Sequence, residues 1–531
     1  MPGPVNPPTD AFHVYDTTLR DGAQREGMSL SIHDKLAVAR HLDDLGIGFI
    51  EGGWPGASPK ETEFFKLAQT ELNLAHATLV AFGATRKADG NAADDPQVAA
   101  LRESGASVVT LVAKAHARHV ESALRTTLHE NLAMIRDTVT HLRAEGQRVF
   151  VDAEHFFDGY RFDKDYTLEV VRTAADAGAD VVVLCDTNGG MLPHWVGEMV
   201  GLTRESTSAR LGIHCHNDVA CAVANSIAAI EAGATHVQGC ANGYGERAGN
   251  ADIFAVIGNL ETKLEKRVLP DGKLREMVRI SHAIADVTNI GHDSHQAFVG
   301  ASAFAHKAGL HASAVKVNED LYQHMDPTLV GNDMRMLVSE MAGRALIELK
   351  GKELGMEIDT DTAARVVAMV KQRESQGYTY EAADASFELM LRADLEGELP
   401  KAYELESWRV IVERRADGEV VSEATVKMVI DGERIVSTGE GNGPVNALDT
   451  ALRQALGALH PELADLELVD YKVRILDTTH GTSAVTRVLV TTSDGLGEWD
   501  TIGVHENVVA ASWEALEDAV TYGLMRSSRS Q

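Results

Sequence analysis

Apolar runs long enough for buried strands alternate with amphipathic, helix-like stretches through the first half of the chain. Eight such runs occur between Phe12 and about Asn259, and a segment with helical periodicity follows each of them. The predicted strands end near Thr17, Gly53, Gly83, Val112, Glu154, Asp186, His216 and Cys240. Eight strand–helix units within roughly 250 residues are typical of a closed (β/α)8 TIM barrel. An open doubly wound sheet is the alternative, although no G-x-G-x-x-G turn follows the first strand.

Residue types at the helix ends support this alternation. Ser31 with Asp34 three residues later resembles a capping box, and Gly46 is placed to end the helix that follows. The pattern (D/E)AGA(D/T) occurs at residues 176–180 and again at 231–235. It is typical of a helix-to-strand turn in which glycine adopts the left-handed conformation.

The pattern changes in the second half of the chain. Residues 266–400 are mostly helical in pattern, with polar interruptions. Three predicted strands and a helix then occupy residues 408–459, and the same order recurs at 468–524, which indicates an internally duplicated βββα domain. The resulting division is a disordered leader at 1–11, a catalytic barrel at 12–265, helical linker subdomains at 266–400 and a C-terminal domain at 401–531.

Composition narrows the possible partners and the compartment. The formal net charge of −30 argues against nucleic acid or an anionic membrane surface as a partner. No apolar run reaches the roughly 18 residues of a membrane span. None of the four cysteines belongs to a C-x-x-C pair, so a disulfide framework is not expected and a reducing, cytoplasmic setting is indicated.

Two segments carry candidate metal-binding side chains. Arg20 and Asp21 follow the first predicted strand, and His214 and His216 lie on the seventh. Histidines two apart on a strand point to the same face, so with Asp21 they would form a two-histidine, one-carboxylate site with open positions. An isolated H-x-H is more often structural. Zinc, manganese, magnesium and iron(II) all suit such a ligand set.

Other polar residues near strand ends are candidates for chemistry, each with a plainer alternative. Arg20 could stabilise an oxyanion, or form a structural salt bridge with Glu154. Glu154 could be catalytic or simply balance an arginine. Thr187 could bind a substrate carboxylate or cap the next helix. Asn250 follows a glycine-rich loop and could join the metal or its surroundings, and Cys240 could be a nucleophile or base, or a buried small residue.

These motifs together resemble those of the DRE-TIM metallolyase superfamily, which includes the isopropylmalate, homocitrate and citramalate synthases. The resemblance rests on Asp16-Thr-Thr-Leu-Arg-Asp-Gly-x-Gln24, His214-Cys-His-Asn-Asp218 and Asn242-Gly-x-Gly-Glu-Arg-x-Gly-Asn250, and it extends to the C-terminal domain. Segments 51–59, 151–158 and 503–508 look most like those of bacterial (R)-citramalate synthases. Cys240 departs from the pattern, since such synthases often carry threonine there.

The resemblance implies a condensation of acetyl-CoA with pyruvate, in isoleucine biosynthesis. A divalent metal (zinc, manganese or magnesium) would be held by Asp21, His214, His216 and Asn250. Arg20 would stabilise the developing alkoxide and contact the substrate. Thr187 would bind the pyruvate carboxylate.

The resemblance also implies catalytic residues outside the barrel, an assembly and a regulator. His311 and Tyr322, supported by Glu154, would help to deprotonate the acetyl methyl group. The linker subdomain of the family reaches over a partner's barrel, which implies a homodimer or a higher oligomer. The C-terminal domain resembles the family's allosteric module, which would bind isoleucine or leucine. Its loops at 439–447 and 503–510 occupy equivalent places before predicted helices and suit a carboxylate effector, or serve only as caps and turns.

Three other functions fit parts of the same sequence. A 2-isopropylmalate synthase would use 2-oxoisovalerate in leucine biosynthesis. A metal-dependent acyl-CoA lyase or carboxyltransferase could use the same barrel, with Cys240 or Lys114 as the distinguishing residue. A non-enzymatic amino-acid sensor would show gaps in the catalytic set, and none is found.

Overall fold

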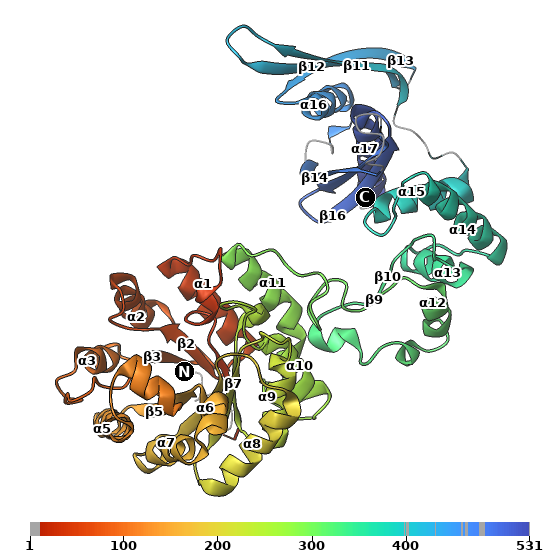
Figure 1. Cartoon of the computed structure of the whole chain (residues 1–531). Helices are drawn as coiled ribbons and strands as arrows, with labels where there is room; N and C mark the ends of the chain where they lie inside the picture. Colours follow the sequence, from red (N-terminus) through yellow and green to blue (C-terminus); the bar gives the residue numbers. More distant parts are fainter. Residues whose placement is uncertain are drawn as a thin grey trace, which may run out of the picture. The chain divides into compact units, whose positions relative to one another are not determined.

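The computed structural model of the chain describes residues 11–529, apart from 398, 400–402, 431, 458–459, 462–465 and 477–483. The leader predicted at residues 1–11 lies outside the described residues except for its last position. The chain forms two compact units (Figure 1). The first comprises Met1–Phe304 and Met325–Asp333, and the second comprises Ala305–His324 and Met334–Gln531.

Eight parallel strands close into a barrel in the first unit, which confirms the predicted fold class (Figure 1). The strands are β1 (His13–Asp16), β2 (Phe49–Gly53), β3 (Thr78–Ala84), β4 (Val108–Lys114), β5 (Arg148–Glu154), β6 (Val181–Asp186), β7 (Leu211–Cys215) and β8 (His236–Gly239). Strand β1 pairs with both β2 and β8, so the sheet has no free edge. The open-sheet alternative is therefore wrong.

Helices follow the strands and pack around the barrel. They are α1 (Ile32–Leu45), α2 (Pro59–Glu71), α3 (Pro96–Glu103), α4 (Ala117–His119), α5 (Leu128–Ala144), α6 (Phe156–Phe162), α7 (Lys164–Asp176), α8 (Pro193–Ser206), α9 (Ala222–Glu231), α10 (Ile253–Thr262) and α11 (Met277–Thr288). The predicted capping box at Ser31 and Asp34 is present. Gly46 ends α1 with a φ of 94°, a left-handed conformation that favours glycine.

The barrel interior contains an aromatic layer and a polar layer. Rings of His13, Phe49, Phe150 and His236, from the first residues of their strands or near them, pack together at the amino ends. Tyr15 lies above them, and its hydroxyl donates a hydrogen bond of 2.6 Å to Oε2 of Glu51. The polar layer therefore begins inside the barrel and continues toward the carboxyl ends of the strands, where TIM-barrel enzymes keep their active sites.

A pair of short strands and several helices form the first part of the second unit. A two-stranded parallel pair joins β9 (Ala305–His306) to β10 (Arg335–Met336). The helices are α12 (Gly309–Val315), α13 (Arg344–Glu353), α14 (Thr360–Ser375) and α15 (Asp384–Glu396).

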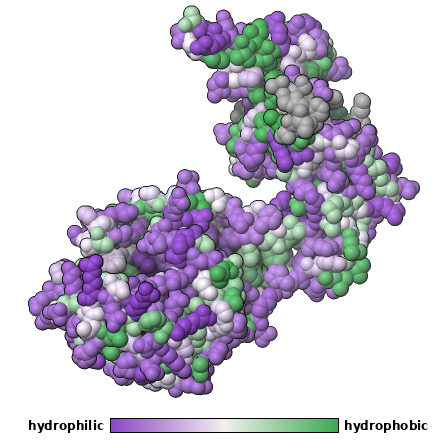
Figure 2. All heavy atoms as spheres, in the orientation of Figure 1, coloured by the Kyte–Doolittle hydropathy of each residue, from purple (hydrophilic) through white to green (hydrophobic). Residues whose placement is uncertain are grey.

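Two similar halves complete this unit and confirm the predicted duplication. In the first half, β11 (Glu404–Arg414), β12 (Val420–Ile430) and β13 (Glu433–Gly441) form an antiparallel sheet that packs on α16 (Pro444–Leu456). In the second, β14 (Glu467–Ile475), β15 (Thr486–Ser493) and β16 (Glu498–His505) pack on α17 (Val508–Arg529). None of the described helices is long and apolar enough to cross a membrane. The visible surface is mostly hydrophilic, in keeping with 24% charged residues (Figure 2).

Candidate active site

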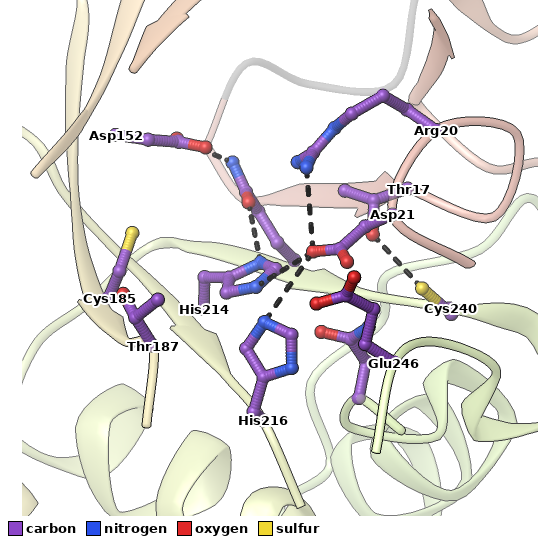
Figure 3. A network of polar contacts seen from close by, with 12 residues as sticks. Thr17, Arg20, Asp21, Asp152, Cys185, Thr187, His214, His216, Cys240 and Glu246 are labelled. Carbon is purple, nitrogen blue, oxygen red and sulfur yellow. Dashed lines mark hydrogen bonds and ion pairs between the residues drawn. The ribbon is translucent and has the colours of Figure 1, made fainter. Parts of the chain in front are cut away.

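Three buried side chains from the two ends of the barrel sequence meet at its carboxyl-end mouth (Figure 3). Nε2 of His214 lies 3.3 Å from Oδ2 of Asp21, and Nε2 of His216 lies 3.7 Å from the same oxygen. One ligand atom from each residue falls within 4.8 Å of the other two. A single cation could therefore contact all three side chains.

Strand geometry and a tight turn bring these residues together. His214 and His216 point the same way because they are two apart at the end of β7, while Cys215 between them packs into the core. Asp21 stands at the start of a turn that continues from β1. The Asp16 carboxylate fastens this turn by accepting hydrogen bonds from the backbone N–H groups of Thr18 and Ala241.

Asn250 adds an oxygen acceptor to the same place. Its backbone bridges to His216, and its Nδ2 donates a hydrogen bond of 3.0 Å to the carbonyl of Tyr244. That bond leaves Oδ1 buried without a hydrogen-bond partner. A buried unpaired acceptor is costly, so this oxygen suits a bound cation. The donor set of two imidazoles, a carboxylate and an amide oxygen fits a divalent metal without selecting one.

The glycine-rich loop before Asn250 has a steric reason for its composition. Gly245 has a φ of 142°, and a Cβ there would lie 2.3 Å from Nδ2 of Asn250. Arg247 fastens the loop by donating hydrogen bonds to Asp218 and to the carbonyl of Thr187. The loop is therefore shaped around Asn250 and joined to the ends of β6 and β7.

Arg20 is held by the carboxylates of its neighbours. Its Nε donates a hydrogen bond of 2.5 Å to Oε1 of Glu51, and its guanidinium lies 3.9 Å above the ring centre of Phe82. The predicted salt bridge of Arg20 is present, but its acidic partners are Glu51 and Asp21, so the suggested partner Glu154 is wrong. Burial lowers the pKa of Arg20, but these two carboxylates outweigh it and raise the pKa above its usual value. A permanent positive charge thus faces the mouth.

The charges of the cluster influence one another. Burial raises the pKa of Asp21, but Arg20 and then His214 outweigh burial and hold that pKa well below its usual range. Burial, and next His214, lower the pKa of His216 to about 4. Burial also lowers the pKa of His214, yet the Asp21 carboxylate raises it above its ordinary value. Asp21 is therefore ionised and His216 is neutral at neutral pH, as metal ligands must be.

Glu154 and Lys114 form an ion pair at the ends of β5 and β4. The next residue, His155, has a left-handed backbone with a φ of 58°. Its ring packs edge-on against that of His119, with the ring centres 4.2 Å apart. Since Lys114 is engaged with Glu154, the carbamylated-lysine alternative finds no support.

Thr187 lies just after β6 and faces the mouth (Figure 3). Its Oγ1 accepts a hydrogen bond of 2.9 Å from the backbone N–H of His155. The predicted alternative of a helix cap is wrong, because α8 begins after Leu192. The hydroxyl proton of Thr187 is available to a ligand.

His311 and Tyr322 belong to the second unit, whereas the other seven predicted site residues belong to the first. His311 lies in α12, and its ring stacks on that of Tyr322 with the ring centres 4.1 Å apart. The tyrosine is 41% exposed, so part of its side chain is open to solvent.

Cys240 is fully buried at the end of β8, and its Sγ lies 3.1 Å from Oγ1 of Thr17. Burial raises the pKa of this thiol well above its usual value. A thiol with a raised pKa is a poor nucleophile and a poor base at neutral pH, so the structure favours the packing role.

Sequence reasoning missed several polar residues of the site. Glu51 and Gln238 are fully buried in strands, and Glu51 is the hydrogen-bond acceptor that holds Arg20. Glu246, from the glycine-rich loop, points toward Asp21 (Figure 3). A charged or amide side chain within an otherwise apolar strand was the available signal for the first two residues.

The effector loops differ in their helix caps. Before α17, Oδ1 of Asn507 already accepts hydrogen bonds from the N–H groups of Val509 and Ala510. Before α16, the cap residue is Gly443, which offers no side-chain cap. The loop before α17 therefore caps its helix, whereas the loop before α16 supplies no side-chain cap from its N-cap residue.

Three known families match successive segments of the chain. The HMGL-like family matches residues 11–284, the homocitrate synthase post-HMGL domain-like family matches 298–377, and the LeuA allosteric (dimerisation) domain matches 381–524. The chain is 67% identical to an (R)-citramalate synthase of Streptomyces coelicolor, over 98% of this chain and 97% of the relative. The chain belongs to the (R)-citramalate synthase family. Another family member, from Aquifex aeolicus, is 45% identical over 97% of this chain and 98% of its own length.

The related 2-isopropylmalate synthases are less similar to this chain in sequence. One from Methanocaldococcus jannaschii is 33% identical over 96% of this chain and 94% of its own length. The predicted resemblance to this group of condensing enzymes is confirmed, and so is its (R)-citramalate synthase branch.

Proposed function

We propose that this chain condenses acetyl-CoA with pyruvate and water to give (R)-citramalate and free CoA. The 67% identity to an (R)-citramalate synthase over nearly the whole chain carries this proposal. The barrel-mouth cluster of Asp21, His214 and His216 supports it, because a keto acid needs a cationic site for its oxygens. The 2-isopropylmalate alternative has the weaker support of a 33% identical relative.

The metal would be held by Asp21, His214, His216 and Asn250. Bound there, a divalent cation supplies a Lewis acid that polarises the keto group of the substrate. Zinc, manganese and magnesium all suit this ligand set. The orphaned Oδ1 of Asn250 is the feature of the chain that best supports this assignment.

The roles around the keto acid follow from charge and donor direction. Thr187 donates its hydroxyl proton to the pyruvate carboxylate, because the hydroxyl oxygen already accepts from His155. Arg20 faces the keto oxygen with a charge fixed by Glu51, and it stabilises the negative charge that develops as the new carbon–carbon bond forms.

The acetyl methyl group must lose a proton before it can attack. We assign this step to His311 and Tyr322, with Glu154 supporting, as the resemblance of the motifs implies. The stacked arrangement of His311 and Tyr322 suits them to act as a pair. Hydrolysis of the resulting thioester then releases CoA and makes the condensation irreversible.

Assembly and regulation complete the proposal. The LeuA allosteric (dimerisation) domain at 381–524 supports a homodimer or a higher oligomer under amino-acid control. We assign isoleucine as the effector, with leucine as the alternative. The four cysteines are all free, which suits the reducing cytoplasm in which we place the enzyme.

A thiol-trapping assay tests the proposed reaction. Purified protein with acetyl-CoA and a panel of 2-keto acids should release CoA fastest with pyruvate, and chiral chromatography should identify (R)-citramalate. Preference for 2-oxoisovalerate would instead make the chain a 2-isopropylmalate synthase. His214→Ala should abolish turnover with an unchanged circular dichroism spectrum, whereas His194→Ala, on the exposed surface of α8, should not.

A further inference from the structure

A buried amide on β8 links His214 of β7 to a carboxylate on β5. Gln238 of β8 is fully buried, and Asp152 of β5 and His214 of β7 are 4% and 5% exposed. Nε2 of Gln238 donates a hydrogen bond of 3.0 Å to Oδ1 of Asp152. Oε1 of Gln238 lies 2.9 Å from Nδ1 of His214. Figure 3 shows His214 and Asp152 at the two ends of this chain of contacts.

The donor and acceptor of each hydrogen bond follow from the contact between Gln238 and Asp152. Oδ1 of Asp152 accepts its hydrogen bond from the amide nitrogen of Gln238. Gln238 must then present its NH2 group to Asp152, and its carbonyl oxygen to His214. Because that oxygen can only accept, Nδ1 of His214 must carry a proton.

This arrangement decides which nitrogen of His214 can bind a cation. With its proton on Nδ1, the imidazole offers the lone pair of Nε2 to a cation. Nε2 is the nitrogen that lies 3.3 Å from Oδ2 of Asp21, on the side of the candidate metal ligands. His216 provides the contrast, since its buried Nδ1 has no hydrogen-bond partner. Of the two candidate histidine ligands, only His214 is thus held by a hydrogen bond at Nδ1.

We propose that Gln238 is a positioning residue that forms, together with Asp152, a hydrogen-bond relay to His214. The relay holds His214 in the Nδ1-protonated tautomer and so presents Nε2 to the metal. The inference rests on the proposed metal site and gives roles to Gln238 and Asp152, to which the sequence motifs assign none. Hydrogen-bonded partners of this kind orient histidine ligands and typically change metal affinity by about 10- to 100-fold.

Metal affinity at pH 8, measured by competition with a chromogenic zinc chelator, tests the relay without relying on turnover. Gln238→Leu should weaken zinc binding by about 10- to 100-fold, because Nδ1 of His214 loses its acceptor. Gln147→Leu is the matched control. Gln147 is also buried and bonds to the carbonyls of Leu101 and Ala106, away from the cluster. The zinc affinity of Gln147→Leu should equal that of the wild type.

A double variant distinguishes the relay from simple packing. In Gln238→Glu with Asp152→Asn, the new carboxylate accepts from Nδ1 of His214 and from the new amide, so the donor pattern toward His214 is kept. This variant should bind zinc within about 3-fold of the wild type, and it should recover kcat/KM relative to Gln238→Leu. If Gln238→Leu fails to fold, Gln238→Met removes the same polar atoms and carries the same expectation.

The outcomes separate the relay from the proposed function. Zinc binding by folded Gln238→Leu equal to that of the wild type would overturn the relay while leaving the metal site intact. A double variant as weak as Gln238→Leu would also overturn it. Absence of zinc binding in the wild type would overturn the metal site and the relay together.

Discussion

The backbone N–H of His155 donates a hydrogen bond of 2.9 Å to the hydroxyl oxygen of Thr187, and so joins the ends of β5 and β6. His155 makes this contact from a left-handed backbone conformation with a φ of 58°, which costs free energy for a residue other than glycine. The contact uses an acceptor site of the hydroxyl and leaves its proton for a ligand. The orientation of Thr187 is therefore set by the backbone of its neighbouring strand.

Replacing Thr187 should affect pyruvate specifically. Thr187→Val keeps the shape but removes both the donor and the acceptor of the His155 N–H, so KM for pyruvate should rise by about 10- to 100-fold, as expected when a hydrogen bond to a charged group is lost. KM for acetyl-CoA should stay the same. Thr187→Ser, which keeps the hydroxyl, is the control in steady-state assays. An unchanged KM for pyruvate in Thr187→Val would remove this residue from the substrate site.

Arg20 should not be replaceable by lysine. The guanidinium bonds to Glu51 through Nε while another nitrogen faces Asp21 at 3.6 Å, and a single ammonium cannot reproduce this fork. Arg20→Lys should lower kcat by about 100- to 1,000-fold with KM little changed, because the lost contact forms mainly in the transition state. Arg40→Lys, on the exposed face of α1, is the matched control. A kcat within a few-fold of wild type would contradict the assigned role.

Feedback inhibition should depend on the loop before α16. Gly443 caps this helix in an extended conformation, and a Cβ there would meet no atom within 4 Å. Gly443→Asp therefore fits, caps the helix and places a negative charge where an effector carboxylate would bind. The isoleucine concentration for half-inhibition should rise at least about 10-fold with uninhibited activity unchanged.

The control for this charge change is Gly291→Asp, in an exposed part of the first unit where a Cβ would also meet nothing within 4 Å. It should leave inhibition as in the wild type. Full sensitivity of Gly443→Asp to isoleucine would place the effector site elsewhere. If leucine alone inhibits the wild type, leucine is the effector instead of isoleucine.

Asp518 should make the stability of α17 depend on pH. Burial raises the pKa of Asp518 to about 7, although its carboxylate accepts a hydrogen bond of 2.6 Å from Ser386. An unfolded aspartate titrates near 3.9, so the folded state binds more protons between about pH 4 and 7. Stability must therefore fall as pH rises through that window, by an amount on the order of 4 kcal/mol.

Hydrogen–deuterium exchange of residues 508–524, corrected for the intrinsic rate, measures this effect. Wild-type protection should decrease from pH 5 to pH 8. Asp518→Asn keeps an acceptor for Ser386 without the charge, and its protection should stay nearly constant. Equal pH dependence in the two proteins would assign the effect to groups other than Asp518.

Much of the barrel follows from local pattern, and the candidate metal ligands follow from strand periodicity. All eight strands lie where the apolar runs predict them, because buried parallel strands need continuous apolar sequence. His214 and His216 share a face because they are two residues apart. Asp21 joins them because β1 and β7 both pair with β8 in the closed barrel.

The partners of these residues depended on pairings that spacing does not reveal. Arg20 follows β1, whose neighbours are β2 and β8, so Glu51 of β2 reaches it and Glu154 of β5 does not. Gln238 meets Asp152 across the barrel interior, 86 residues away in sequence. Such contacts follow from the closed geometry rather than from any short motif.

The order of the strands around the barrel has a consequence for protein synthesis. Asp21 leaves the ribosome almost 200 residues before His214, and Asn250 comes later still. Because β1 pairs with β8, the barrel cannot close until the last strand has been synthesised. A nascent or truncated chain that ends before β8 therefore cannot assemble this cluster of side chains, and only a finished barrel brings them together.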